Sequence, residues 1–333
     1  MASNNKTLLW LHSGGCGGCT MSLLCAEAPG FFDALQLAGI DLLWHPSLSQ
    51  ASGDDALALF DALASGERAL DILCVEGSVM TGADGAYHLL PDGRPYSRLI
   101  EAIARRAQTV IAVGTCAAYG GISAAGDNLG GATGLAFDSS LPGGLLGADF
   151  AARAGLPVVN IAGCPTHPDW VLETLALVAR GELAATDLDR LGRPRFYADR
   201  LVHHGCARNE YYEFKASAEA PGQAGCLMEY AGCKGTQAHA DCNTRPWNGA
   251  GSCIDGGHAC VNCTSPHFAD PGHPFQSTPK IAGFPVGLPT DMPKAWFVAL
   301  ATLSKSATPA RVRANATADR ERVAPSISGR VKP

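Results

Sequence analysis

Short apolar runs recur along the first half of the chain and predict its strands. Five of them are nearly continuous rather than alternating, at residues 7–11, 41–45, 70–75, 109–113 and 158–161. Such runs are typical of strands that are buried on both faces of a parallel sheet. Apolar residues at helical spacing predict helices over residues 54–64, 97–107 and 168–180. The alternation of strands and helices predicts an α/β fold with a doubly wound parallel sheet.

Past residue 200 the pattern changes, because regular periodicity fades and loop residues dominate. One more helix is predicted over residues 293–304. A segment that buries little apolar surface needs another source of stability, and metal cross-links supply one. We therefore expect a sheet domain over residues 1–195, an irregular domain over 196–304 and a flexible basic tail over 305–333. The alternative for the tail is docking to an acidic partner or an anionic membrane surface.

Length, composition and charge narrow the class of protein. The 333 residues are 47% hydrophobic, which supports a folded core and excludes a disordered chain. The net charge of 25 − 31 = −6 argues against a general nucleic-acid binder. No apolar run approaches the roughly 20 residues that a membrane span needs, and no export signal is recognisable. The sequence therefore predicts a soluble protein that stays in the cytoplasm or leaves it only with a partner.

Thirteen cysteines need an explanation in a chain that is expected in a reducing compartment. Disulfides are rare there, so metal ligation or redox chemistry is favoured. Six cysteines are spread over the first half, whereas seven lie between residues 206 and 263. Iron–sulfur clusters use about four thiolates each, sometimes with histidine in place of one. Structural zinc also uses tight Cys/His quartets, and zinc stays open as the alternative for the crowded segment.

Four early cysteines directly follow predicted strands, with glycines beside them. They are Cys16, Cys19, Cys116 and Cys164. In an open α/β sheet the ligand crevice lies at the carboxyl ends of the strands, so these thiolates are expected to converge on a 4Fe–4S cluster. Taken alone, the pair Cys16 and Cys19 also fits a thioredoxin-type redox motif. Cys25, on the next helix, and Cys74, inside a strand, are interpreted as small core residues.

The second half supplies donors for two more sites. Its cysteines are Cys206, Cys226, Cys233, Cys242, Cys253, Cys260 and Cys263. Seven thiolates cannot fill two four-ligand sites, and one histidine would complete the eight. His203 lies three residues before Cys206, so the two can share a site on a turn. An imidazole in place of a thiolate removes negative charge and tends to raise a cluster's reduction potential.

Together these motifs resemble the small, electron-transferring subunit of nickel–iron hydrogenases, from Leu8 to about Phe268. The resemblance rests on CGGC at 16–19, VEG at 75–77, GTCAAYGG at 114–121, GCP at 163–165, His203-x-x-Cys206, GCKG at 232–235, RPWN at 245–248 and GHACxxC at 257–263. It implies a flavodoxin-like N-terminal domain followed by an irregular domain that binds iron–sulfur clusters.

The same resemblance implies three clusters in a line. A proximal cluster would use Cys16, Cys19, Cys116 and Cys164, a distal cluster His203, Cys206, Cys226 and Cys233, and a medial cluster Cys242, Cys253, Cys260 and Cys263. In the family a separate large subunit holds the Ni–Fe centre that cleaves dihydrogen. This chain would dock that subunit and pass electrons to an acceptor that the sequence does not identify. A dimer of heterodimers is the expected assembly.

Glu76, at the end of the third predicted strand, is expected to face the interface with the large subunit. A carboxylate there could take part in proton relay or hydrogen bonding. A plain structural role is the alternative.

Three departures from the family pattern refine the expectation. Many members have proline where Cys253 stands and carry a 3Fe–4S medial cluster, so a fourth thiolate predicts a medial 4Fe–4S cluster here. Gly18 and Gly121 stand where oxygen-tolerant, membrane-bound members have two extra cysteines, which excludes a proximal 4Fe–3S cluster with six thiolates. Cys226 and Cys233 are seven residues apart, one more than usual, so their loop is expected to bulge.

Two other classes of protein compete with this interpretation. The related cluster-bearing subunit of a quinone-reducing complex resembles the first half but lacks the ligands after residue 200. A zinc-stapled structural protein would be colourless and contain zinc in place of iron. The sequence therefore favours the electron-transfer subunit of a hydrogenase, with the active site on the partner subunit.

Overall fold

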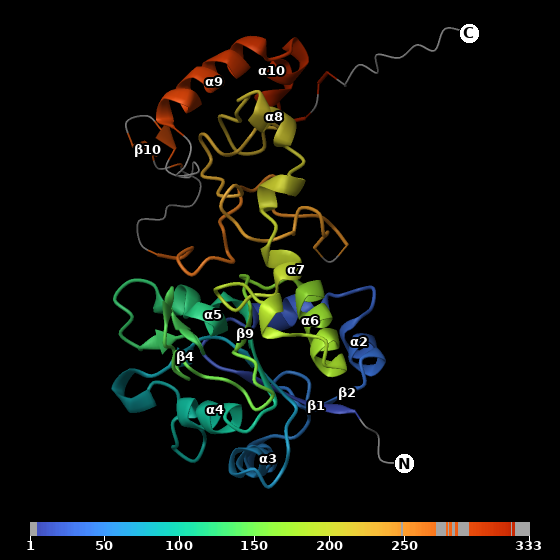
Figure 1. Cartoon of the computed structure of the whole chain (residues 1–333), viewed down its shortest axis with the longest axis vertical. Helices are drawn as coiled ribbons and strands as arrows, with labels where there is room; N and C mark the ends of the chain where they lie inside the picture. Colours follow the sequence, from blue (N-terminus) through green and yellow to red (C-terminus); the bar gives the residue numbers. More distant parts are fainter. Residues whose placement is uncertain are drawn as a thin grey trace, which may run out of the picture. The chain divides into compact units, whose positions relative to one another are not determined.

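The computed structural model describes residues 5–247, 249–270, 278, 280, 281, 284, 285, 293–320, 322 and 323, and its chain divides into two compact units (Figure 1). The first unit comprises Met1–Asp199, Trp247–Gly249 and Cys263–His273; the second comprises Arg200–Pro246, Ala250–Asn262 and Pro274–Pro333. The first stretch of the first unit ends at Asp199, four residues after the domain boundary that the sequence predicts at residue 195. Residues 263–273 belong to the first unit, which the sequence pattern does not reveal.

A five-stranded parallel sheet forms the centre of the first unit. Its strands are β1 (Lys6–His12), β2 (Ile40–Trp44), β3 (Ile72–Glu76), β5 (Thr109–Val113) and β9 (Val159–Ile161), in the order β2-β1-β3-β5-β9. Every residue of β3 and β5 is buried, as the continuous apolar runs predict. The strand order is that of a flavodoxin-like sheet, so the predicted fold class is confirmed.

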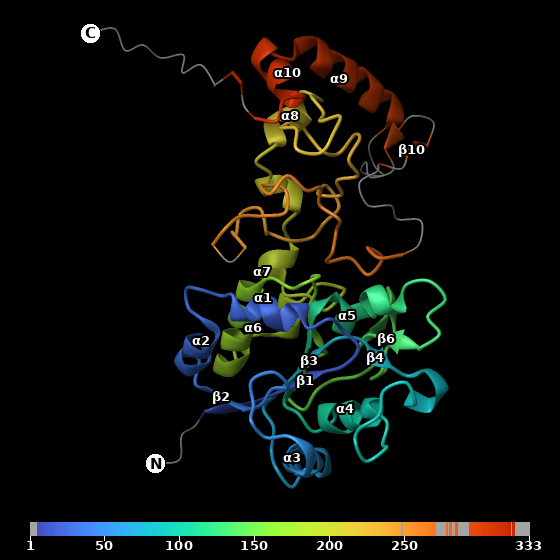
Figure 2. The same cartoon turned by 180° about the vertical axis from the view of Figure 1, so that it is seen from behind.

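Helices cover both faces of this sheet. They are α1 (Gly18–Leu24), α2 (Phe31–Leu37), α3 (Gly53–Ser65), α4 (Tyr96–Ala104), α5 (Gly114–Tyr119), α6 (Pro168–Arg180) and α7 (Arg195–Ala198). Figure 2 shows α3 and α4 on one side of the sheet and α1 and α6 on the other. The predicted helix over 97–107 ends early, at Ala104, and the other two predicted helices in this unit match within a residue at each end.

Short elements decorate the first unit. Strand β4 (Val79–Met80) pairs with β6 (Ala132–Thr133), and β7 (Phe137–Asp138) pairs with β8 (Leu141–Pro142). Three short 3-10 helices complete this unit: η1 (Gly82–Gly85), η2 (Gly121–Ala124) and η3 (Ala185–Asp187).

Helix α6 shows how local sequence sets these boundaries. Pro168 occupies its first turn, and the Nδ1 atom of His167 accepts a hydrogen bond from the Asp169 N–H at 3.2 Å, which caps the helix. Gly181 ends it in the left-handed region, at φ 69°. The apolar face carries Trp170, which is 1% exposed and stacks on Tyr197 with ring centroids 4.2 Å apart.

The second unit has far less regular structure. Its elements are η4 (Val202–Gly205), α8 (Asn209–Glu213), β10 (Lys280–Ile281), β11 (Phe284–Pro285), α9 (Lys294–Ala307) and α10 (Ala310–Ala316). Helix α9 confirms the helix predicted over 293–304. No helix in the described part of the chain is both long and apolar enough to cross a membrane.

The flexible tail predicted from residue 305 is wrong for its first part. Helix α9 continues to Ala307, and α10 follows at once. Val312 and Ala316 lie four residues apart on one face of α10 and pack with Tyr211. Two apolar residues in a strongly basic segment are enough to anchor it, and a count of charges overlooks them. Residues 324–333 lie outside the described residues.

Candidate functional site

The four cysteines predicted at the strand ends lie in the first unit, just past the carboxyl edge of the sheet. Cys16 and Cys19 follow β1, Cys116 lies in the first turn of α5 after β5, and Cys164 follows β9. Glu76 ends β3, which is the neighbour of β1 at the point where the strand order reverses. This is the position at which doubly wound sheets bind ligands.

Each of these four thiols is linked by its charge to at least one other of the group, and the ligand set itself stays a prediction. Burial, and then the charge of Glu76, raises the pKa of Cys19, with smaller contributions from Cys116 and Cys164. Burial raises the pKa of Cys164 to about 12, and the charges of Cys116 and Cys16 add to it. Thiols of this kind become thiolates only when a cation offsets the cost. The group therefore suits a metal centre better than it suits free thiolates.

Glycines leave room beside the sulfur atoms. A Cβ on Gly114, whose φ is +86°, would lie 2.5 Å from the Cys19 Sγ. A Cβ on Gly121, at φ +57°, would lie 2.7 Å from the Cys116 Sγ. Only glycine fits at these two positions, because a side chain would meet both steric clash and backbone strain. The cradle fits a compact inorganic group held by the thiolates.

Glu76 is buried beside this group, with only 2% of its surface exposed. Its Oε1 accepts hydrogen bonds from the N–H groups of Cys19 and Thr20, both at 3.1 Å. Its Oε2 accepts from the Trp10 Nε1–H at 3.2 Å and from the Thr20 hydroxyl. The carboxylate is thus held by four donors of its own chain, and its role at the interface with the large subunit stays a prediction.

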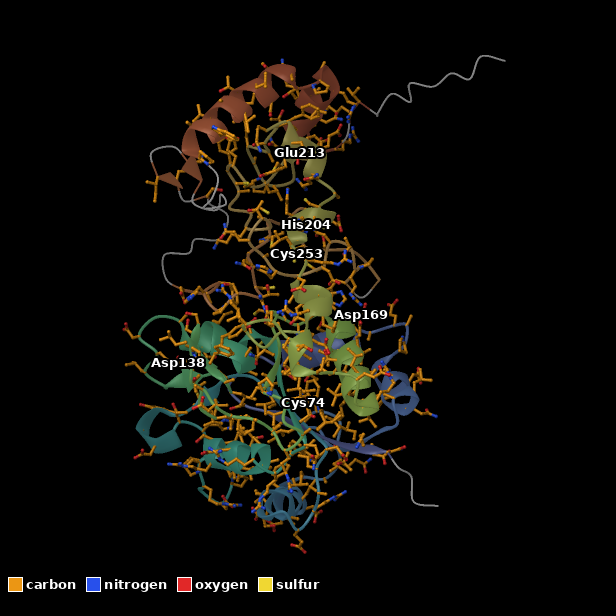
Figure 3. The ribbon with its side chains drawn as sticks, viewed as in Figure 1. Cys74, Asp138, Asp169, His204, Glu213 and Cys253 are labelled. Carbon is orange, nitrogen blue, oxygen red and sulfur yellow. The ribbon has the colours of Figure 1, made fainter. Side chains whose placement is uncertain are left out.

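The two cysteines assigned to the core behave differently. Cys74 is fully buried within β3, as predicted (Figure 3). Cys25 is exposed, so its assignment as a core residue is wrong. Helix α1 has only seven residues and ends at Leu24, which turns Cys25 out of the packed face. All thirteen cysteines lie among the described residues, and none of them forms a disulfide.

In the second unit, the four predicted distal ligands line one cavity. His203, Cys206, Cys226 and Cys233 face it together with Arg208, Tyr212, Leu227, Met228, Gly235, Thr236 and Ile254. Burial raises the pKa of Cys226 to about 12 and lowers the pKa of His203, which keeps the imidazole neutral as a metal ligand requires. The charge of Cys233 acts on both Cys206 and Cys226.

Backbone amides point at the sulfurs of this cavity with a repeated spacing. The Arg208 N–H donates to the Cys206 Sγ at 3.4 Å. The N–H groups of Met228 and Gly235 bond Cys226 and Cys233 in the same way, each from two residues further on. Such donors lower the pKa of the thiols and stabilise metal-bound thiolates. Loops and the 3-10 turn η4, rather than any α-helix or strand, therefore position these ligands.

The predicted medial ligands fall into different units. Cys242, Cys253 and Cys260 belong to the second unit, whereas Cys263 belongs to the first. Cys253 is exposed. In the first unit the Cys263 carbonyl accepts a hydrogen bond from the Thr115 hydroxyl, and the charge of Cys263 acts on Cys164. The medial set stays a prediction. Among the described residues, no three His, Cys, Asp or Glu side chains are arranged to hold a single metal ion.

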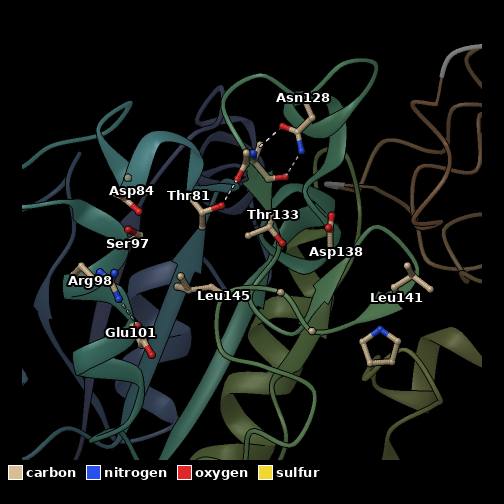
Figure 4. Close-up of a pocket in the computed structure, with 16 residues that line it drawn as sticks. Thr81, Asp84, Ser97, Arg98, Glu101, Asn128, Thr133, Asp138, Leu141 and Leu145 are labelled. Carbon is tan, nitrogen blue, oxygen red and sulfur yellow. Dashed lines mark hydrogen bonds and ion pairs between the residues drawn. The ribbon is translucent and has the colours of Figure 1, made fainter.

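A wider cavity of the first unit, about 750 Å³, is separate from the cysteines (Figure 4). Its lining includes Asp84, Glu101 and Asp138, and none of the twelve predicted ligands. In the lining, the Asn128 Oδ1 accepts a hydrogen bond from the Ala132 N–H at 2.7 Å, and the Asn128 Nδ2 donates to the Ala132 carbonyl at 2.9 Å. This cavity is therefore separate from the predicted cysteine sites.

Comparison with known proteins resolves the competing classes. A family model described as the 20 kDa subunit of NADH ubiquinone oxidoreductase matches residues 16–178, and one described as the C-terminal part of NiFe/NiFeSe hydrogenase small subunits matches residues 197–276. The small subunit of the periplasmic [NiFeSe] hydrogenase of Desulfomicrobium baculatum is 33% identical over 285 residues, which cover 80% of this chain and 86% of that protein. The chain belongs to the nickel–iron hydrogenase small subunits. The ligand-rich second half is what separates it from the quinone-reducing complex.

Other relatives agree with this membership. The small subunit of F420 non-reducing hydrogenase II of Methanosarcina mazei is 35% identical over 293 residues, covering 80% of this chain and 74% of that one. Among solved structures, the actinobacterial-type NiFe-hydrogenase of Ralstonia eutropha H16 matches with a TM-score of 0.75 and 31% identity, covering 93% of both chains. The predicted function is confirmed: the chain is the electron-transfer subunit of a hydrogenase, it pairs with a large catalytic subunit, and it carries iron–sulfur clusters.

Three features of the sites were not recognised in the sequence. The four donors to Glu76 come from β1 and α1, and only the fold brings them to β3. Arg208 carries no motif that marks it as a neighbour of the distal ligands. The amide donors two residues after Cys206, Cys226 and Cys233 could have been suspected from the sequence only weakly. The sole hint is that small or flexible residues follow two of these cysteines, in Cys206-Ala207 and in Cys233-Lys234-Gly235.

Proposed function

We propose that this hydrogenase subunit carries its electrons through three 4Fe–4S clusters with a proximal, a medial and a distal position. The proximal ligands are Cys16, Cys19, Cys116 and Cys164; the medial ligands are Cys242, Cys253, Cys260 and Cys263; the distal ligands are His203, Cys206, Cys226 and Cys233. The observation that carries the proposal is the lining of one cavity by all four distal donors, three of which receive an amide hydrogen bond two residues later.

When bound, such clusters accept and release one electron at a time. The protein's part is to hold the sulfurs, to exclude water and to balance charge. The segments that follow β1, β5 and β9 carry the sulfur donors at one edge of the sheet, and the glycine cradle lets the backbone approach them. The amide donors at Cys206 and at Cys19, whose Sγ accepts from the Thr166 N–H at 3.5 Å, stabilise the anionic form.

Single substitutions test the proximal set against matched controls. Cys116→Ser should remove the proximal electron paramagnetic resonance (EPR) signal and lower the iron content by about one cluster, while leaving the other signals. The exposed Cys25 and the buried Cys74 serve as controls, and Cys25→Ser and Cys74→Ala should keep every signal. Equal losses of iron in Cys116→Ser and Cys25→Ser would contradict the assignment.

A separate substitution tests the medial cluster type. Cys253→Pro removes the fourth thiolate, so a 3Fe–4S signal should appear in the oxidised protein, with a higher reduction potential. If no such signal appears in a variant that retains the other clusters, Cys253 is not a medial ligand.

We further propose that the active assembly is a dimer of heterodimers. Purification of this chain with its large subunit, followed by native mass spectrometry, should give two copies of each chain. The separated small subunit should show no dihydrogen uptake with an artificial dye, whereas the co-purified pair should. Uptake by the lone chain would contradict the division of labour.

We also keep the cytoplasm as the proposed compartment, although relatives described as periplasmic exist. Eleven of the thirteen cysteines are proposed cluster ligands, and a reducing compartment keeps such thiols free until iron is bound. Fractionation with a cytoplasmic marker enzyme tests the proposal, and recovery of the subunit with a periplasmic marker would overturn it.

A further inference from the structure

Charges of opposite sign lie next to the proximal and the distal ligands. Beside the proximal set is Glu76. Among the causes that raise the pKa of Cys19, its charge ranks second to burial and ahead of the neighbouring thiols, and it also acts on Cys116. An anion in a buried site acts strongly on its neighbours because little water screens it.

The hydrogen bonds around Glu76 favour a negative charge on it. All four groups that contact its oxygens donate to them. The Thr20 hydroxyl is itself oriented by His45, whose Nε2 lies 3.3 Å from the Thr20 Oγ1. The Nδ1 of His45 accepts from the Ser47 N–H at 3.1 Å, which leaves the ring proton on Nε2. The Thr20 hydroxyl can then donate only toward Glu76.

At the distal ligands the neighbouring charges are positive and partly buried. The Arg208 guanidinium lines the cavity, and its Nη1 donates to the carbonyls of Gln223 at 2.6 Å and Gly225 at 2.9 Å. Its charge acts on Cys206 and Cys233. The carboxylate of Asp255 opposes it at Cys206 but contributes less.

Lys215 adds a second cation. Its Nζ lies 3.8 Å from the ring centroid of Tyr212, and that ring packs edge-on against His203 with centroids 4.3 Å apart. The charge of Lys215 acts on Cys226. Glu213 and Glu229 lie close enough to Lys215 to oppose it, so Lys215 is expected to matter less than Arg208.

We propose that these residues impose a difference in reduction potential along the subunit: Glu76 lowers the potential of the proximal cluster, and Arg208, with Lys215, raises that of the distal cluster. The inference rests on the ligand sets of the proposed function. Reduction adds one negative charge to a cluster, which a neighbouring anion opposes and a neighbouring cation favours. The fixed charges thereby favour electron flow from the proximal to the distal cluster.

Redox titration of the intact heterodimer, followed by EPR, tests this directly. Glu76→Gln keeps the shape of the side chain and removes the charge. It should favour reduction of the proximal cluster about tenfold, a rise of about 59 mV for one electron. Arg208→Gln should disfavour reduction of the distal cluster by a similar factor, and Lys215→Met by less. The charge-conserving variants Glu76→Asp and Arg208→Lys should stay close to the wild type.

Controls separate a local charge effect from a general one. Glu101→Gln and Arg195→Gln remove one charge each at partly exposed positions of the first unit and should leave both potentials unchanged. Iron content and both EPR signals are measured in every variant. Missing clusters in the wild type would overturn the proposed ligands. Clusters present with unmoved potentials in Glu76→Gln and Arg208→Gln would overturn the charge effect alone. Should Glu76→Gln lose its iron, the distal variants decide, and an unmoved distal potential overturns the proposal.

Discussion

The two units of this subunit hold their metal ligands by different means. In the first, cysteines sit at the ends of strands that pack with helices into one apolar cluster, which includes Leu73, Ile100 and Val110, all fully buried. In the second, ligands sit on loops, and apolar clusters are small, such as Tyr211 with Val312 and Ala316. The first unit has a core that can fold around an empty site. The second depends on its inorganic cross-links in the way that small metal-binding domains do.

The largest expected consequence is in the iron-free protein. Without clusters, amides of the second unit should exchange with solvent as in an unfolded chain, because binding free energy there is folding free energy. Amides of β3 and β5 should stay protected. Hydrogen exchange read by mass spectrometry measures both in one sample. Equal loss of protection in the two units would remove the distinction between them.

A smaller effect is expected for a buried ion pair of the first unit. Arg193 donates to the Asp189 carboxylate from Nε at 2.8 Å and from Nη2 at 2.6 Å, and both side chains are nearly buried. Arg193→Gln would leave the carboxylate without its partner and should lower the free energy of unfolding by about 3–5 kcal/mol. Thermal or denaturant unfolding of the first unit measures this.

The matched control is an ion pair on the surface of the same unit. Arg195 and Asp199 lie 3.1 Å apart with about half of each side chain exposed. Arg195→Gln should therefore cost about 0–1 kcal/mol. If the two substitutions cost the same, burial does not govern the stability of the first unit.

The smallest effect concerns acid. Burial lowers the pKa of His45 from 6.5 to about 4, so the unfolded chain binds more protons than the folded one between these values. Stability should accordingly fall as the pH drops from about 6.5 toward 4, by at most roughly 3 kcal/mol, and His45 should contribute no pH dependence above that window.

Comparison of variants isolates this contribution. His45→Gln should flatten the decline in thermal midpoint of the first unit between pH 7 and pH 5, whereas His267→Gln, at a partly exposed position of the same unit, should leave it in place. An unchanged slope in His45→Gln would show that the buried imidazole is not the acid-sensitive group.

Sequence patterns predicted the first unit well because periodicity reports burial. The runs at β3 and β5 are almost wholly apolar, and the cysteines after β5 and β9 closely follow strands that apolar runs predict. The patterns predicted less where long-range packing decides. Exposure of Cys25 depends on where a seven-residue helix stops, and α10 depends on a contact with Tyr211 about a hundred residues earlier in the sequence.

The sites show the same division. Residue type and spacing marked the distal ligands, and the cavity in the second unit brings all four together. Residue type and spacing could not show that Glu76 accepts four hydrogen bonds, because its donors are far from it in the sequence. They could not show that Arg208 is a cation beside thiolates either, because that contact follows from loop geometry.

The central claim is that this subunit carries three four-iron clusters, and the iron and acid-labile sulfide content of the small subunit, separated from the large one, tests it most directly. Three such clusters require roughly 12 irons and as many sulfides per chain. A value near eight of each, or zinc in place of iron, would contradict the account.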